Sequence, residues 1–301
     1  MSDQFQALIE SNRRLTDIFE GKVKEIDKKV EDAVGAVPQA IIDNFTKKNV
    51  KLDPINGDDS SVNGPFKTLK AAILSIPDGG NIVVEFPYSS SQEVVELDEG
   101  IGIGSRIVVL KGGWSGMENS GLKACVLRPL AGFNETFNRT YMRGYISGEP
   151  GGRVYILNLL VEMPRIIEGS TIEHGLNGAF ITGGVTVTTH HYSISGPHIY
   201  YVEGTTRPMY FLRSSARDGK ANLQDFTISY THIQTSLGEP IINLQYGTGT
   251  LRFAYYGGNV SDKEGATVTY ANIFDGLSYG DHGYATNILA NGSMLKQPVE
   301  G

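Results

Sequence analysis

The sequence contains one cysteine, one tryptophan and no long hydrophobic run. Because a lone Cys125 has no partner within the chain, an intrachain disulfide and a cysteine-based metal cluster are both excluded. No run of about 18 apolar residues occurs, so we expect no membrane-spanning helix and no membrane insertion. The first residues also lack the basic and apolar regions of a secretory signal. We therefore expect a protein assembled in the cytoplasm, with no signal peptide.

Basic residues are in the minority, with 26 Lys and Arg against 33 Asp and Glu, which gives a net charge of −7. A nucleic-acid partner needs a basic face, so we expect no nucleic-acid binding. Glycine, in contrast, is abundant: 37 of 301 residues, against an average share of roughly 7%. The hydrophobic share of 40% argues against wholesale disorder.

Residues 1–48 differ in composition from the rest, because they contain only two of the glycines, Gly21 and Gly35. Their apolar residues recur with the seven-residue period of a coiled coil, and charged residues surround them. The residues that we expect to mediate trimerisation are Ile9, Phe19, Val23, Ile26, Val30 and Val37. β-Branched residues at the first heptad position favour three or more helices over two. The alternative is an amphipathic helix that packs on its own domain.

A break in the helix is expected near Pro38, which would begin a second short helix over residues 38–45. Residues 49–112 then predict a short strand at 50–54, one helix at 65–76 and strands at 81–86 and 106–111. An ordinary parallel α/β sheet would need a crossover helix between its strands, and none can be placed here.

From residue 113 onward the sequence alternates short β-branched or aromatic segments with Gly, Asn and Asp. We expect strands within residues 152–161, 183–189, 221–229 and 249–256. Two mainly β architectures fit this pattern, a parallel β-helix and a β-sandwich. The helix at 65–76 favours the β-helix, because the open end of a solenoid exposes its core and needs a cap.

Three segments of the first β module are residues 52–60, 64–73 and 76–80. Together they resemble the N-terminal module of pectate-lyase-like right-handed parallel β-helices, which is common in bacteriophage tail fibres and tailspikes. The specific similarity covers residues 50–112, together with the general layout of the chain. The fold that it implies is a right-handed parallel β-helix, preceded by an N-terminal α-helical trimeric coiled coil and a capping helix.

The heptad segment and residues 283–293 are similar to the stem and the closing segment of many phage fibre proteins. The resemblance implies a homotrimer in the virion tail, with its N-terminus fixed to a tail or baseplate protein. The implied domains are a stem at 1–48, a first module at 49–112, a receptor-facing shaft at 113–285 and a C-terminal tail at 286–301.

Tyrosine and histidine are concentrated between residues 190 and 256. A tyrosine offers a flat apolar face and a hydroxyl group, both of which can contact sugars. The residues expected to contact a bacterial surface polysaccharide are Tyr192, His198, Tyr200, Tyr201, Tyr230, His232, Tyr255 and Tyr256. The alternative is that these are half-buried strand residues or part of a trimer interface.

No catalytic residue, cofactor or metal site is expected. The acids of the β region are Asp218, Asp225, Glu239, Asp262, Glu264, Asp275 and Asp281, and most of them are typical of turns. Adjacent His190 and His191 would point to opposite faces of a strand and could not share a metal. We therefore expect a binding protein. The alternatives are a tailspike enzyme that degrades or deacetylates the polysaccharide, and a purely structural baseplate protein.

Overall fold

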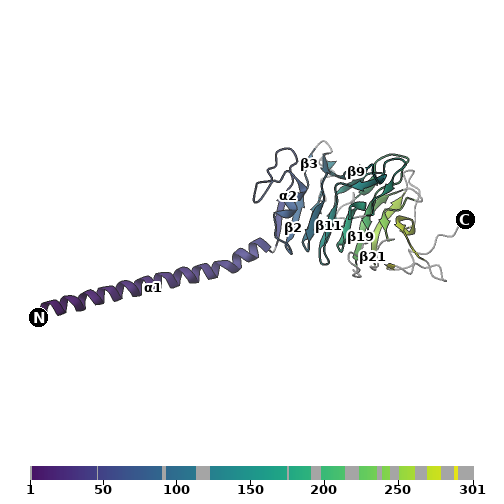
Figure 1. Cartoon of the computed structure of the whole chain (residues 1–301). Helices are drawn as coiled ribbons and strands as arrows, with labels where there is room; N and C mark the ends of the chain where they lie inside the picture. Colours follow the sequence, from purple (N-terminus) through teal and green to yellow (C-terminus); the bar gives the residue numbers. More distant parts are fainter. Residues whose placement is uncertain are drawn as a thin grey trace. The chain divides into compact units, whose positions relative to one another are not determined.

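The structure is a computed structural model that describes residues 2–45, 47–89, 93–112, 123–174, 176–190, 198–213, 224–235, 239–244, 251–261, 270–278 and 288–290. The chain divides into two compact units, Met1–Thr46 and Lys47–Gly301. The first unit is helical and the second is mainly β (Figure 1).

The first unit consists of one continuous helix, α1 (Ser2–Phe45), of 44 residues. The expected break at Pro38 is therefore wrong. Proline removes one backbone hydrogen bond, but its fixed φ is helical, so a helix can continue through it. No helix in the described part of the chain is long and apolar enough to cross a membrane.

The heptad residues of α1 lie uncovered. Phe19 is 71% exposed, Ile26 57% and Val30 55%, and every described side chain from residue 5 to residue 32 is exposed. The side chain of Val37 lies outside the described part. In a single chain α1 therefore buries no apolar stripe over this length, although most helices in proteins depend on such burial for their stability.

The second unit contains a first parallel ladder, which we call ladder 1. Its strands, in spatial order, are β1 (Lys48–Lys51), β2 (Asn81–Glu85), β6 (Ile107–Lys111), β12 (Arg153–Leu157), β16 (Thr186–His190), β19 (Gln224–Gln234), β21 (Leu251–Ser261) and β23 (Ile288–Ala290). Spatial order follows sequence order, and Figure 1 shows the colours changing steadily from β2 to β21. Each strand of ladder 1 thus pairs with the strands that precede and follow it in this series.

A second parallel ladder, ladder 2, begins with β4 (Val94–Leu97), β8 (Val126–Pro129), β13 (Leu160–Met163) and β17 (His198–Tyr201). It continues through the second halves of β19 and β21, where His198 pairs with His232 and His232 with Asn259. The two long strands therefore belong to both ladders.

The third parallel sheet contains β5 (Ile101–Gly104), β11 (Ile146–Gly148), β15 (Ala179–Gly183), β18 (Tyr210–Arg213), β20 (Ile242–Asn243) and β22 (Phe274–Asp275). Smaller elements are β3 (Tyr88–Ser89), β7 (Lys123–Ala124), β9 (Ala131–Asn134), β10 (Arg139–Met142), β14 (Thr171–Ile172), η2 (Leu176–Gly178) and η3 (Tyr270–Ile273). Parallel pairing in the large sheets distinguishes this fold from an antiparallel β-sandwich.

The core is built from like residues stacked on successive strands. One column of ladder 1 contains Ile82, Val108, Val154, Val187 and Phe226, all fully buried. An aromatic series continues it, whose neighbouring rings lie 5.2 to 6.0 Å apart; its members are Phe180, Phe211, Phe226, Phe253 and Phe274. The stacked columns bury apolar surface along the whole described β unit.

The helix expected at 65–76 is shorter, because α2 covers only Leu69–Leu74. Thr68 is its N-cap and accepts a hydrogen bond from the backbone N–H of Ala71. Phe66 instead forms a β-bridge with Leu52, so Pro65 precedes the helix rather than opening it. Leu69 and Ile73 are buried in the core, and Figure 1 shows α2 beside β2.

The strand expected over residues 152–161 is divided into β12 and β13 by a corner at Asn158. Asn158 has φ +50°, a conformation that asparagine tolerates better than most residues. The corner moves the chain from ladder 1 to ladder 2. At the other end of the chain, residues 288–290 of the expected C-terminal tail form β23 and pair with β21.

Glycines stack at the ends of β5, β11 and β15, where Gly104, Gly148 and Gly183 lie in register. Gly183 has φ +87°, and a Cβ atom there would lie 2.5 Å from the carbonyl oxygen of Gly148. This position therefore requires glycine for both its conformation and its space.

We predict that Gly183→Ala lowers the free energy of unfolding by about 2 kcal/mol or more, because alanine is strained at positive φ and contacts backbone. Gly102→Ala is the matched control. Gly102 lies in the same sheet, and a Cβ atom added there would have no other atom within 4 Å. Its effect should stay within about 1 kcal/mol. Urea unfolding at equal protein concentration measures both, and equal losses would contradict the role of the glycine stack.

Candidate functional site

The structure describes some of the residues expected to contact a polysaccharide and not others. Tyr192 lies outside the described residues, and so do the side chains of His198, Tyr230 and Tyr255. The backbones of these last three lie in β17, β19 and β21. The described side chains of the set are Tyr200, Tyr201, His232 and Tyr256.

Tyr200 and Tyr201 are neighbours on β17 and point to opposite faces of ladder 2. Tyr201 is only 7% exposed, belongs to the core, and has a pKa that burial raises well above its ordinary value. It therefore cannot contact a polymer on the outer surface, and its inclusion in the contact set is corrected. Tyr200 is half-buried on the outer face, where burial and then the neighbouring charge of Glu162 raise its pKa to about 12.

The outer face of ladder 2 carries a row of polar residues, Glu96, Arg128, Glu162 and Tyr200, which we call the polar ladder. Glu96 pairs with Arg128 in register, and Glu162 pairs with Tyr200. Arg128 Nε donates to Glu162 Oε2 at 2.5 Å, while Arg128 Nη1 lies 3.6 Å from Glu96 Oε1. The hydrogen bond to Glu162, followed by the charges of Glu162 and Glu96, raises the pKa of Arg128.

His232 and Ser261 extend this outer face onto β19 and β21. His232 Nε2 lies 3.0 Å from Ser261 Oγ, a hydrogen-bond distance. Burial lowers the pKa of His232, which favours the neutral ring. Tyr256 is 59% exposed on β21. The described part of ladder 2 thus presents carboxylates, a guanidinium, an imidazole and hydroxyl groups at the strand spacing of about 4.8 Å.

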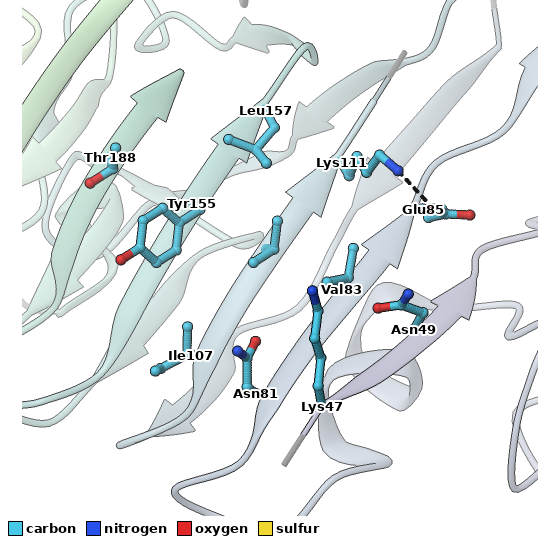
Figure 2. Close-up of a pocket in the computed structure, with 11 residues that line it drawn as sticks. Lys47, Asn49, Asn81, Val83, Glu85, Ile107, Lys111, Tyr155, Leu157 and Thr188 are labelled. Atoms are coloured by element: carbon cyan, nitrogen blue, oxygen red, sulfur yellow. Dashed lines mark hydrogen bonds and ion pairs between the residues drawn. The ribbon is translucent and has the colours of Figure 1, made fainter. Parts of the chain in front are cut away.

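A groove of about 650 Å³ lies on the outer face of ladder 1 and crosses five strands from β1 to β16 (Figure 2). Its apolar floor, with one tyrosine, consists of Val83, Ile107, Val109, Tyr155 and Leu157. Its polar lining consists of Lys47, Asn49, Asn81, Glu85, Lys111 and Thr188. We call this feature the outer groove.

The outer groove follows from strand register. Val83, Val109, Tyr155 and Thr188 are partners in successive pairs, so their side chains form one outward column between inward core columns. Lys111 Nζ and Glu85 Oε1 form an ion pair of 2.9 Å at its edge, drawn as a dashed line in Figure 2. The Oδ1 atom of Asn81 is buried and has no hydrogen-bond partner among the described residues.

Neither the polar ladder nor the outer groove was expected from the sequence. Strands of a parallel sheet read as continuous apolar runs. The run Ile82, Val83, Val84 indicated an apolar outer face. Alternate residues of a strand face opposite sides, so Val83 must face outward when Ile82 and Val84 face the core.

The acids considered for catalysis fall into two groups. Asp218, Asp262, Glu264 and Asp281 lie outside the described residues. Each of the others is paired with an arginine: Asp225 with Arg252 at 2.6 Å, Glu239 with Arg165 at 2.9 Å and Asp275 with Arg207 at 3.6 Å. In the described part of the chain, His, Cys, Asp and Glu form no group of three that could hold a metal ion.

We predict that Glu162→Gln lowers the free energy of unfolding by about 1–2 kcal/mol, because it removes the charge that faces the half-buried Arg128. Glu96→Gln is the matched control on the same arginine. Glu96 is 55% exposed and more distant, so its effect should stay within about 0.5 kcal/mol. Thermal unfolding at one protein concentration compares them, and a larger loss for Glu96→Gln would contradict the assignment.

Comparison with known proteins finds no family model, no curated protein and no solved structure that matches the chain.

Proposed function

We propose that the second unit is a right-handed parallel β-helix. Three features support this. The chain returns repeatedly to the same parallel ladders in sequence order, the described part after β2 contains no α-helix, and the core is a stack of like residues. Connections between parallel strands of one sheet are right-handed in nearly all proteins, which sets the expected hand.

The proposed partners of α1 are two further copies of this chain in a trimeric coiled coil. Val23 and Val30 occupy the first heptad position, and Ile26 occupies the fourth. β-Branched residues at these positions favour higher-order coils over dimers. The charged residues around the seam pair on the helix surface, as Glu25 does with Lys22 at 2.8 Å and Lys29 at 2.9 Å. The hydrogen bonds from these two lysines lower the pKa of Glu25.

The function that these features support best is a trimeric phage tail fibre or short tailspike in the virion. Its helical unit would attach to a tail or baseplate protein, and its β unit would bind a bacterial surface polysaccharide. The observation that carries this proposal is the uncovered heptad seam of α1, because a helix of this length without a covered apolar face gains no packing stability. The resemblance of residues 50–112 supplies the biological context.

The proposed polysaccharide surface is the outer face of ladder 2. Tyr200 and His232 lie there, alongside the charged members of the polar ladder, and the exposed Tyr256 lies on β21 between the ladder 1 and ladder 2 parts of that strand. Hydroxyl-rich sugars bind through hydrogen bonds and through the faces of aromatic rings. Three such surfaces in one trimer would raise the effective concentration of weak sites, so each site can be weak on its own.

We predict that Val23→Asp with Val30→Asp dissociates the trimer, because carboxylates would be buried in the seam. The matched control is Ser11→Asp with Gly21→Asp, which adds the same charge at outward heptad positions and leaves the trimer intact. Sedimentation gives the masses, against 32.7 kDa for one chain. A monomeric wild-type protein would contradict the proposal. A valine variant that remains trimeric would mean that the β unit alone holds the assembly.

We predict that Tyr200→Ala and Tyr256→Ala each weaken polysaccharide binding by about tenfold, which corresponds to one lost aromatic contact of about 1.4 kcal/mol. Tyr141→Ala, in β10 and away from ladder 2, should bind normally. The isolated protein is tested against a panel of capsular and lipopolysaccharide polymers. No binding to any polymer or host cell would favour the purely structural baseplate protein. Falling viscosity or new reducing ends would favour the tailspike enzyme.

A further inference from the structure

We infer that the outer groove is covered by a second copy of this chain, so that the outer face of ladder 1 forms part of the trimer interface. This inference rests on the proposed trimer and adds to it the surface through which the β units meet. In a threefold assembly the contact is heterologous, so each groove faces a different surface of the neighbouring copy.

The composition of the groove is the first argument. Parallel sheets are normally covered on both faces, because their strands are apolar on both. The inner face of ladder 1 covers the core, but its outer face also presents Ile107, Val109 and Leu157, which no described segment of the same chain buries completely. The outer face of ladder 2, in contrast, is occupied by the ion-paired polar ladder. Ladder 1 therefore has the face that gains more from a protein cover.

The connectivity of the chain is the second argument. Helix α1 ends at Phe45 and β1 begins at Lys48, and three residues of extended chain reach about 10 Å at most. In a trimeric coil the three helix ends are held together, so the three copies of β1 are tethered to one another through these short connections. β1 is the first strand of ladder 1 and contributes Asn49 to the groove.

The lining favours a protein occupant over a polysaccharide. Tyr155 is the single aromatic residue among the lining residues, and branched aliphatic side chains make up most of the floor. Such a surface packs well against other aliphatic side chains but offers few rings for sugars to stack on.

The test is thiol labelling of Val109→Cys in the full chain, with Val94→Cys as the matched control. Val94 is 38% exposed on β4 of ladder 2. The native Cys125 is 1% exposed and burial raises its pKa to about 12, so the wild-type chain serves as the unreactive blank. Each cysteine is labelled with a maleimide in the trimer and in the background of Val23→Asp with Val30→Asp.

We expect Val109→Cys to react at least about tenfold more slowly in the trimer than in the dissociated background, because interface burial limits access to transient opening. Val94→Cys should react equally in both. If the helix substitutions alone leave a trimer, adding Val109→Asp must dissociate it. If Val109→Cys fails to fold by circular dichroism, Thr188→Cys at the far end of the groove replaces it.

Three results would overturn the inference, and they are distinguishable from failure of the proposed function. If Val109→Cys is labelled equally fast in a confirmed trimer and in the monomer, the protein is a trimer but the groove is not part of its interface. Protection that appears only when polysaccharide is added would assign the groove to the polymer. A trimer that survives the helix substitutions and Val109→Asp together would place the interface elsewhere. A monomeric wild-type chain, in contrast, would reject the proposed function itself.

Discussion

The β unit depends on the in-register stacking of parallel strands, in which each strand satisfies its backbone hydrogen bonds on its neighbours and repeats their side-chain pattern. Ile82, Val108 and Val154 occupy one column because their strands pair without slipping. A shift by one residue would turn these side chains outward and bring the outward column of Val83, Val109 and Tyr155 into the core. The positions of corners, glycines and surface residues are all fixed by this register.

The same register requires apolar side chains at the inward positions but leaves the chemical character of the outward side chains open. Alternate residues of each strand contribute to the core, and the residues between them face outward. In ladder 1 those outward residues are largely aliphatic, and in ladder 2 they form the ion-paired row centred on Arg128. One repeating core thus supports two surfaces of different chemistry, and we propose that one meets protein and the other meets polysaccharide.

Much of the secondary structure could be predicted from the sequence. The strands near residues 81–86 and 106–111 were marked by β-branched runs, and the heptad pattern marked α1. The break at Pro38 was wrong because proline favours helix starts without forbidding helix interiors. The corner at Asn158 was missed because a single asparagine at positive φ carries no strong turn signal. Tyr201 was misplaced because composition identifies a tyrosine-rich region but not which residue of a strand faces outward. The outer groove combines residues from five strands, so it could be identified only from the pairing register of those strands.

The two long strands β19 and β21 have a structural consequence. Where β12 and β13 are separated by the corner at Asn158, β19 runs without interruption from Thr227, the partner of Thr188 in ladder 1, to His232 in ladder 2. In β21 the change from ladder 1 to ladder 2 falls at Gly257, whose φ of +92° bends the strand there. Pairing between β19 and β21 continues on both sides of this bend, so at this end of the molecule the two faces are joined by one continuous pair of strands.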